Sequence, residues 1–109
     1  MSIFNTLTSN GGGIDSSGTD WVRFTDGTQI CWGSASFARS KSASETFSKS
    51  FLTTPTLMVG KYYYSTSTSG IYGITDVTVE SINTTRVTLH IDSNTVVFTA
   101  CFIAIGRWK

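Results

Sequence analysis

The chain has 109 residues, which is the size of one compact domain, and its formal net charge is +1. Eight basic residues against seven acidic ones create no overall field for nucleic acid or an anionic membrane, and the basic residues are scattered along the sequence. Cys31 and Cys101 are too few for a disulfide framework, so we expect buried free thiols inside strands.

Residues 1–19 predict a flexible lead-in. Gly11, Gly12 and Gly13 stand among many Ser, Thr, Asn and Asp residues, which bury little apolar surface. The segment lacks the charged region and long apolar core of an export signal. We expect a linker to an upstream part of a longer protein, in which Met1 is either the boundary of a fragment or an internal start. A folded domain is expected over residues 20–109.

An Asp-Gly pair at residues 26–27 separates two apolar runs and predicts the first hairpin. A two-residue type I′ loop there would place Val22 opposite Cys31 and Trp21 opposite Trp32. Directly opposed residues share a face of the sheet, so both faces of this hairpin would be largely apolar.

Further strands follow at regular spacing. We predict them over residues 45–51, 56–63, 71–82, 86–91 and 95–108. Polar loops are expected over residues 34–44, 64–70, 83–85 and 92–94. Pro55 precedes the strand at 56–63, where a missing N–H is tolerated. No window shows helical periodicity, so the sequence predicts an all-β antiparallel sandwich of six to seven strands.

Residues 95–108 are apolar on both sides of the expected strand. One face would carry Val96, Phe98, Ala100, Phe102, Ala104 and Trp108, and the other Val97, Cys101, Ile103 and Ile105. The run is too short for a transmembrane helix, which needs about 20 residues. We predict a central strand whose second face is covered by another subunit.

Catalytic patterns are weak in this chain. His90 and Asp92 would share a strand face, but a surface histidine beside a hairpin acid is the simpler interpretation than a hydrolytic triad. One histidine and two distant cysteines lack the spacing of a metal site. We therefore expect no catalytic residues, no metal and no cofactor.

Surface recognition is the remaining possibility. Tyrosine rings offer rigid area for stacking on sugars, and nearby polar groups can exchange hydrogen bonds with sugar hydroxyls. Because consecutive tyrosines point to both faces of a strand, some of them could instead pack in the core or between subunits. The candidate ligand-binding residues are Tyr63, Tyr64, Tyr72, His90, Asp92 and Asn94.

Two motifs, WVRFTDGTQICWG near the start and CFIAIGRWK at the end, resemble the C-terminal domains of bacteriophage tail fibres. Between them, KSFLTTPTLMVG, DVTVESINTTRVTLHI and FIAIG resemble the H-type lectin module. That resemblance, which covers roughly residues 20–109, implies a six-stranded sandwich that forms homotrimers and binds sugars of the N-acetylgalactosamine type. Lectins of this type hold the sugar with an Asp, an Arg and a Trp, but this chain has no Arg just before Val77 and no Trp near Asp92, so no lectin site residue is carried over.

The resemblance implies a non-catalytic receptor-binding tip of a phage or prophage tail fibre, joined to an upstream fibre shaft. Such a domain would be made in the bacterial host cytoplasm and act outside it on the virion. Its receptor would be a bacterial surface polysaccharide or lipopolysaccharide, a wall glycan or a surface protein, since fold does not dictate the ligand. The alternatives are a purely structural trimerisation cap of a fibre shaft and a polysaccharide-degrading enzyme.

Overall fold

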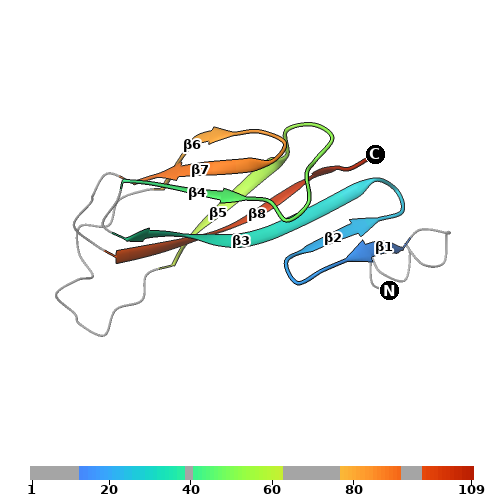
Figure 1. The fold of residues 1–109 in the computed structure, drawn as a ribbon, viewed down its shortest axis with the longest axis horizontal. Coiled ribbons are helices and arrows are strands. Elements are labelled where there is room, and N and C mark those ends of the chain that lie inside the picture. Colours follow the sequence, from blue (N-terminus) through green and yellow to red (C-terminus); the bar gives the residue numbers. More distant parts are fainter. Residues whose placement is uncertain (1–12, 39–40, 63–76, 92–96) are drawn as a thin grey trace.

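The computed structural model describes residues 13–38, 41–62, 77–91 and 97–109, which contain eight strands (Figure 1). The strands are β1 (Ile14–Ser17), β2 (Trp21–Phe24), β3 (Thr28–Ala38), β4 (Ser42–Thr46), β5 (Thr56–Tyr62), β6 (Thr78–Ile82), β7 (Arg86–His90) and β8 (Val97–Arg107). Within these ranges, no helix is long and apolar enough to cross a membrane.

The described residues form two antiparallel sheets. The larger one has the order β1-β2-β3-β8-β5, and the smaller one has the order β4-β7-β6. Figure 1 shows the smaller sheet lying over one face of the larger. The predicted antiparallel sandwich is confirmed, and β8 is a central strand between β3 and β5, as expected. The described part of the chain contains one strand more than the six to seven predicted.

The additional strand is β1, which lies inside the predicted lead-in. Ser17 pairs with Val22 and Ile14 pairs with Phe24 at the edge of the larger sheet. Its pairing depends on main-chain hydrogen bonds, which polar residues make as well as apolar ones. Composition therefore gave no sign of it. The rest of the predicted linker, up to residue 12, lies outside the described residues.

The predicted register of the first hairpin is wrong by one residue. Trp21 pairs with Cys31 and Arg23 pairs with Gln29, so the turn contains Thr25 as well as the Asp-Gly pair. Gly27 has φ of 99°, as in a three-residue loop that ends in a left-handed residue. The extra turn residue turns Trp21 toward the core side of the sheet.

The next segment also differs from the prediction. β3 continues to Ala38, through residues expected to form a loop, because β8 pairs with it along all eleven positions. The strand expected at residues 45–51 is instead β4, which ends at Thr46. Phe47 and Phe51 follow it and pack edge to face, with ring centroids 5.2 Å apart. Their burial, rather than strand alternation, explains the apolar pattern of this segment.

The later strands agree more closely with expectation. β5 and β7 lie where predicted, and Val87 and Leu89 are fully buried while Arg86 is exposed. Asn83 Oδ1 accepts hydrogen bonds from the main-chain N–H groups of Thr85 and Arg86, which forms the predicted turn. The predicted loop at 64–70, the first part of the strand at 71–82 and the turn at 92–94 lie outside the described residues.

The core lies between the two sheets. It consists of Cys31, Ala35, Phe37, Phe47, Phe51, Val87, Leu89, Ile91, Ala100, Phe102 and Ala104. Ala100, Phe102 and Ala104 belong to one of the two apolar faces predicted for β8, and the structure turns this face inward. Gly33 lies beneath the Phe102 ring, where a Cβ atom would come within 3.0 Å of that ring. A residue with a side chain would displace the ring from this position.

Candidate functional site

The outer face of the larger sheet is apolar and uncovered in the single chain. Trp32, Met58, Ile103 and Ile105 are all exposed there, at between 37% and 52% of their surfaces. The register places Ile103 opposite both Trp32 and Met58, so these side chains form one row across β3, β8 and β5. The sequence predicted this second apolar face of β8, and the structure confirms it.

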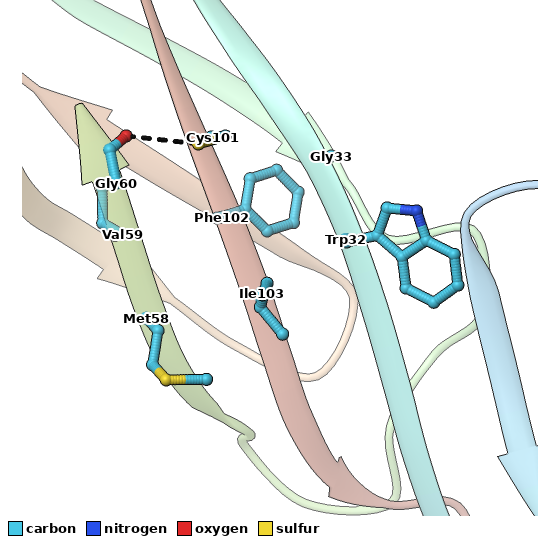
Figure 2. Close-up of a pocket in the computed structure, with 8 residues that line it drawn as sticks. All are labelled: Trp32, Gly33, Met58, Val59, Gly60, Cys101, Phe102 and Ile103. Atoms are coloured by element: carbon cyan, nitrogen blue, oxygen red, sulfur yellow. Dashed lines mark hydrogen bonds between the residues drawn. The ribbon is translucent and has the colours of Figure 1, made fainter. Parts of the chain in front are cut away.

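A depression of about 560 Å³ lies in this face. Figure 2 shows Trp32, Ile103 and Met58 coming from three neighbouring strands along one side of it. The next row of the sheet is built from small residues, because Cys101 pairs with Ser34 on one side and Gly60 on the other. The hollow therefore results from a row of large side chains beside a row of small ones.

The chemistry of the depression favours an apolar contact over a sugar. Its few polar groups include the Cys101 thiol, which donates to the Gly60 carbonyl oxygen at 3.6 Å. Sugars need several directional donors and acceptors, whereas this lining offers mainly aliphatic and aromatic surface. The face is therefore suited to packing against another apolar surface.

Both cysteines are free, as predicted, but only Cys31 is buried. They lie on opposite faces of the larger sheet, since Cys31 is in the core and Cys101 is on the outer face. Burial raises the pKa of the Cys31 thiol. The expectation that Cys101 is buried is wrong for the single chain, because it projects from the uncovered side of β8.

Of the six predicted ligand-binding residues, only His90 is among the described residues. Tyr63, Tyr64, Tyr72, Asp92 and Asn94 lie outside them, and their roles stay predictions.

His90 lies at the end of β7 on the polar outer face of the smaller sheet. Its Nδ1 atom is 3.6 Å from Glu80 Oε1, and Ser42 donates a hydrogen bond to that same oxygen at 3.1 Å. In a hydrolytic triad the imidazole lies between hydroxyl and carboxylate, whereas here Ser42 bonds the carboxylate directly. The cluster offers groups for hydrogen bonding to a polar ligand.

Glu80 was missed by sequence reasoning, which paired His90 with Asp92. β6 has an irregular register between Val79 and Ser81, and this irregularity contains Glu80. No local sequence signal indicates such a bulge, so the neighbour of His90 became evident only from the strand pairing. Among the residues that the structure describes, no group of three or more His, Cys, Asp or Glu could hold a metal ion.

The sequence profile of the H-type lectin domain matches residues 42–105, which is more than half of the 109-residue chain. The chain therefore belongs to the H-type lectin domain family.

Two solved structures share its fold. One is a C-terminal fragment of the R2 pyocin fibre of P. aeruginosa, with a TM-score of 0.65 and 19% identity over 98% of this chain. The other is an N-truncated R2-type pyocin tail fibre, with a TM-score of 0.65 and 20% identity over 97% of this chain. The chain spans 30% and 43% of those two fibre chains. No curated protein sequence gives a significant match.

Proposed function

We propose that this chain is a non-catalytic, receptor-binding domain at the tip of a phage or phage-like tail fibre, and that it recognises a bacterial surface glycan. The observation that carries the proposal is the match of residues 42–105 to the H-type lectin domain, supported by the fold shared with pyocin tail fibres. Such a domain would be made in the bacterial cytoplasm, be joined to a fibre shaft through its N-terminal segment, and act outside the cell on the particle.

We also propose that three copies assemble through the outer face of the larger sheet. The exposed side chains Trp32, Met58, Ile103 and Ile105 form a continuous apolar surface on it. Soluble proteins rarely leave such a surface uncovered unless it binds something. A second and third copy of the chain supply matching apolar surfaces, and closed rotational symmetry lets every copy bury the same face.

In such an assembly, glycan recognition belongs on the remaining surface. His90 lies on the smaller sheet, beside Glu80 and a hydroxyl pair between Ser44 and Thr88 whose oxygens are 2.7 Å apart. These groups can donate to and accept from sugar hydroxyls. The predicted Tyr63, Tyr64, Tyr72, Asp92 and Asn94 complete the proposed set of ligand-binding residues.

A binding assay on bacteria tests the receptor-binding function. The fluorescently labelled chain is mixed with a panel of strains that differ in envelope polysaccharide. We expect attachment to a subset of strains, and we expect periodate oxidation of the cells, which cleaves sugar diols, to remove it. Attachment that resists periodate but is lost after protease treatment would point to a surface protein instead.

Two further results separate the remaining alternatives. A stable trimer that attaches to no strain would favour a purely structural cap of the fibre shaft. Release of sugar fragments from purified envelope would indicate a polysaccharide-degrading enzyme. Replacement of Tyr63, Tyr64 and Tyr72 by alanine should weaken attachment while the trimer stays intact, and undiminished attachment would place the glycan elsewhere.

A further inference from the structure

Two tryptophans and three cations alternate at one end of the sandwich. Lys49 Nζ lies 4.8 Å from the centre of the Trp21 ring, and Arg23 Cζ lies 6.0 Å from that centre. Arg23 Cζ is also 4.9 Å from the centre of the Trp108 ring, which has Lys109 Nζ at 5.0 Å. These five residues, the indole–cation cluster, are separated in sequence by up to 88 positions. The fold alone brings them together.

Partly buried hydrogen bonds hold Arg23 and Trp108 of this cluster in place. Arg23 Nε donates to Gln29 Oε1 at 2.7 Å, and the amide of Gln29, which is fully buried, donates to the Lys49 carbonyl oxygen at 2.9 Å. Trp108 Nε1 donates to the Phe24 carbonyl oxygen at 2.9 Å. Figure 1 shows the C-terminal end of the chain close to the turn that joins β2 to β3. Arg23 and Trp108 are therefore held in position before any ligand binds, which lowers the entropy lost on binding.

Among the residues that the structure describes, none of the three cations forms an ion pair with an acidic side chain. The ion pair found among the described residues is that of His90 with Glu80, on the smaller sheet. Arg23 has five N–H donors, and it uses one on Gln29 and one on the Ser50 carbonyl oxygen at 3.4 Å. Three donors of a fixed guanidinium are left, beside two ammonium groups. Within the described part of the chain, these donors and charges face no anionic group, and an anion is the ligand that suits them.

The cluster lies apart from the surfaces already described. Lys49 is the one member inside the segment matched to the H-type lectin domain, since the others precede residue 42 or follow residue 105. Trp21 pairs with Cys31, so it projects to the core side of the larger sheet, opposite to Trp32 and Ile103. A trimer formed through the outer face would therefore leave the cluster accessible.

We propose that the indole–cation cluster is a second saccharide site, apart from the one around His90, and that it binds an anionic saccharide of the bacterial envelope; this rests on the receptor-binding function proposed above. The planar guanidinium of Arg23 matches the geometry of a carboxylate or phosphate group and binds it with two parallel hydrogen bonds. Lys49 and Lys109 add charge on either side. The partly exposed rings of Trp21 and Trp108 provide flat apolar surface for the C–H groups of the sugar ring.

Binding of defined sugars to the full chain tests this site. The probes are a tetragalacturonate and a mannose 6-phosphate oligosaccharide, each compared with its uncharged counterpart. Titration followed by ¹H–¹⁵N NMR should shift the indole N–H signals of Trp21 and Trp108 and leave that of Trp32 unchanged. The charged probe that binds identifies whether a carboxylate or a phosphate is preferred. Equal shifts with the uncharged sugars, or no shifts with any probe, would overturn the proposal.

A matched pair of double variants separates a specific site from general charge attraction. Lys49→Gln with Lys109→Gln removes two charges from the cluster, and Lys41→Gln with Arg86→Gln removes two exposed charges from the region of the smaller sheet. We expect the first pair to weaken the affinity for the charged probe at least tenfold and the second to change it less than twofold. Equal weakening by both pairs would overturn the site.

Attachment to bacteria distinguishes this proposal from the function on which it rests. Strain-restricted attachment together with no binding of either charged probe would overturn the anionic site and leave the receptor-binding function in place. Binding of a charged probe that depends on Lys49 and Lys109, without attachment to any strain, would support the site and contradict the receptor-binding function. Arg23→Lys provides a further check, because it keeps the charge but loses the two-pronged geometry, and it should weaken binding of the preferred probe.

Discussion

Replacement of Ile103 by aspartate tests whether the outer face of the larger sheet joins copies of the chain. Ile103 lies between Trp32 and Met58 in that face, and 43% of its surface is uncovered in the single chain. Full burial of an isoleucine side chain contributes about 1.5–3 kcal/mol. Covering the remaining surface would therefore contribute about 0.6–1.3 kcal/mol per chain, or about 2–4 kcal/mol in a trimer.

The aspartate both removes this contribution and introduces a charge. Because each 1.4 kcal/mol is a factor of ten in an equilibrium constant, loss of the apolar contact alone weakens association between about 30- and 700-fold. A buried carboxylate must also lose its hydration, at a cost of several kcal/mol per ion. We therefore expect the variant to be monomeric at micromolar concentration.

Light scattering after size-exclusion chromatography measures this directly. The unmodified chain should have three times the 11.8 kDa mass of one copy, and Ile103→Asp should have the mass of one. Leu52→Asp is the control, because Leu52 is 63% exposed but lies between β4 and β5, outside the strands of this face. Circular dichroism establishes that each variant is folded. A folded, trimeric Ile103→Asp variant, or equal dissociation of the Leu52→Asp control, would refute the assignment of the interface.

Three further predictions concern the first turn and the cysteines. Gly27→Ala should lower the Tm by about 4 °C or more, because a left-handed φ costs about 1–2 kcal/mol for a residue with a Cβ atom. An unchanged Tm would contradict the three-residue turn. Hydrogen bonds from the main chain and side chain of Thr28 hold the pKa of Asp26 below its ordinary value of 3.8. The ionised carboxyl therefore stabilises the fold above pH 3.8, and this contribution is lost as the pH falls through the lower pKa of the folded state. Asp26→Asn should therefore lower the Tm at pH 7, and the decrease should become smaller as the pH falls below 3.8; a decrease that does not change with pH would argue against this linkage. Iodoacetamide labelling followed by mass spectrometry should modify Cys101 but not buried Cys31 in a dissociated variant, and Cys101 should be protected in the trimer. Labelling of Cys31 before Cys101 would be inconsistent with the burial and raised pKa of Cys31.

Local pattern was sufficient for the fold class. Alternating apolar residues in β7 and two-faced apolar character in β8 predicted a sandwich with a central C-terminal strand, and both features are present. Period-two geometry converts such a pattern directly into inward and outward faces, so no knowledge of distant residues is needed. The same argument placed Ile103 and Ile105 on one of two apolar faces, of which a single sandwich shelters only one, and the structure shows that theirs is the exposed one.

Features that depend on pairing between strands were not predictable in this way. β1 is polar and joins the sheet through main-chain hydrogen bonds, which leave no periodic signature. One additional turn residue at Thr25 changed the register of the first hairpin and turned Trp21 toward the core side. The bulge that contains Glu80 likewise decided which acid lies beside His90.

The composition and alternation of this chain therefore determined that it is a single β-sandwich with an uncovered apolar face. Only the tertiary structure decided which polar residues become neighbours. Arg23, Lys49 and Lys109 are scattered in the sequence, yet a buried glutamine and the return of the C-terminal end to the first hairpin gather them around two indole rings. Each cation–π contact contributes about 1 kcal/mol or less at an exposed position, which is too little to determine local structure. The positions of these side chains therefore follow from the packing of the whole domain.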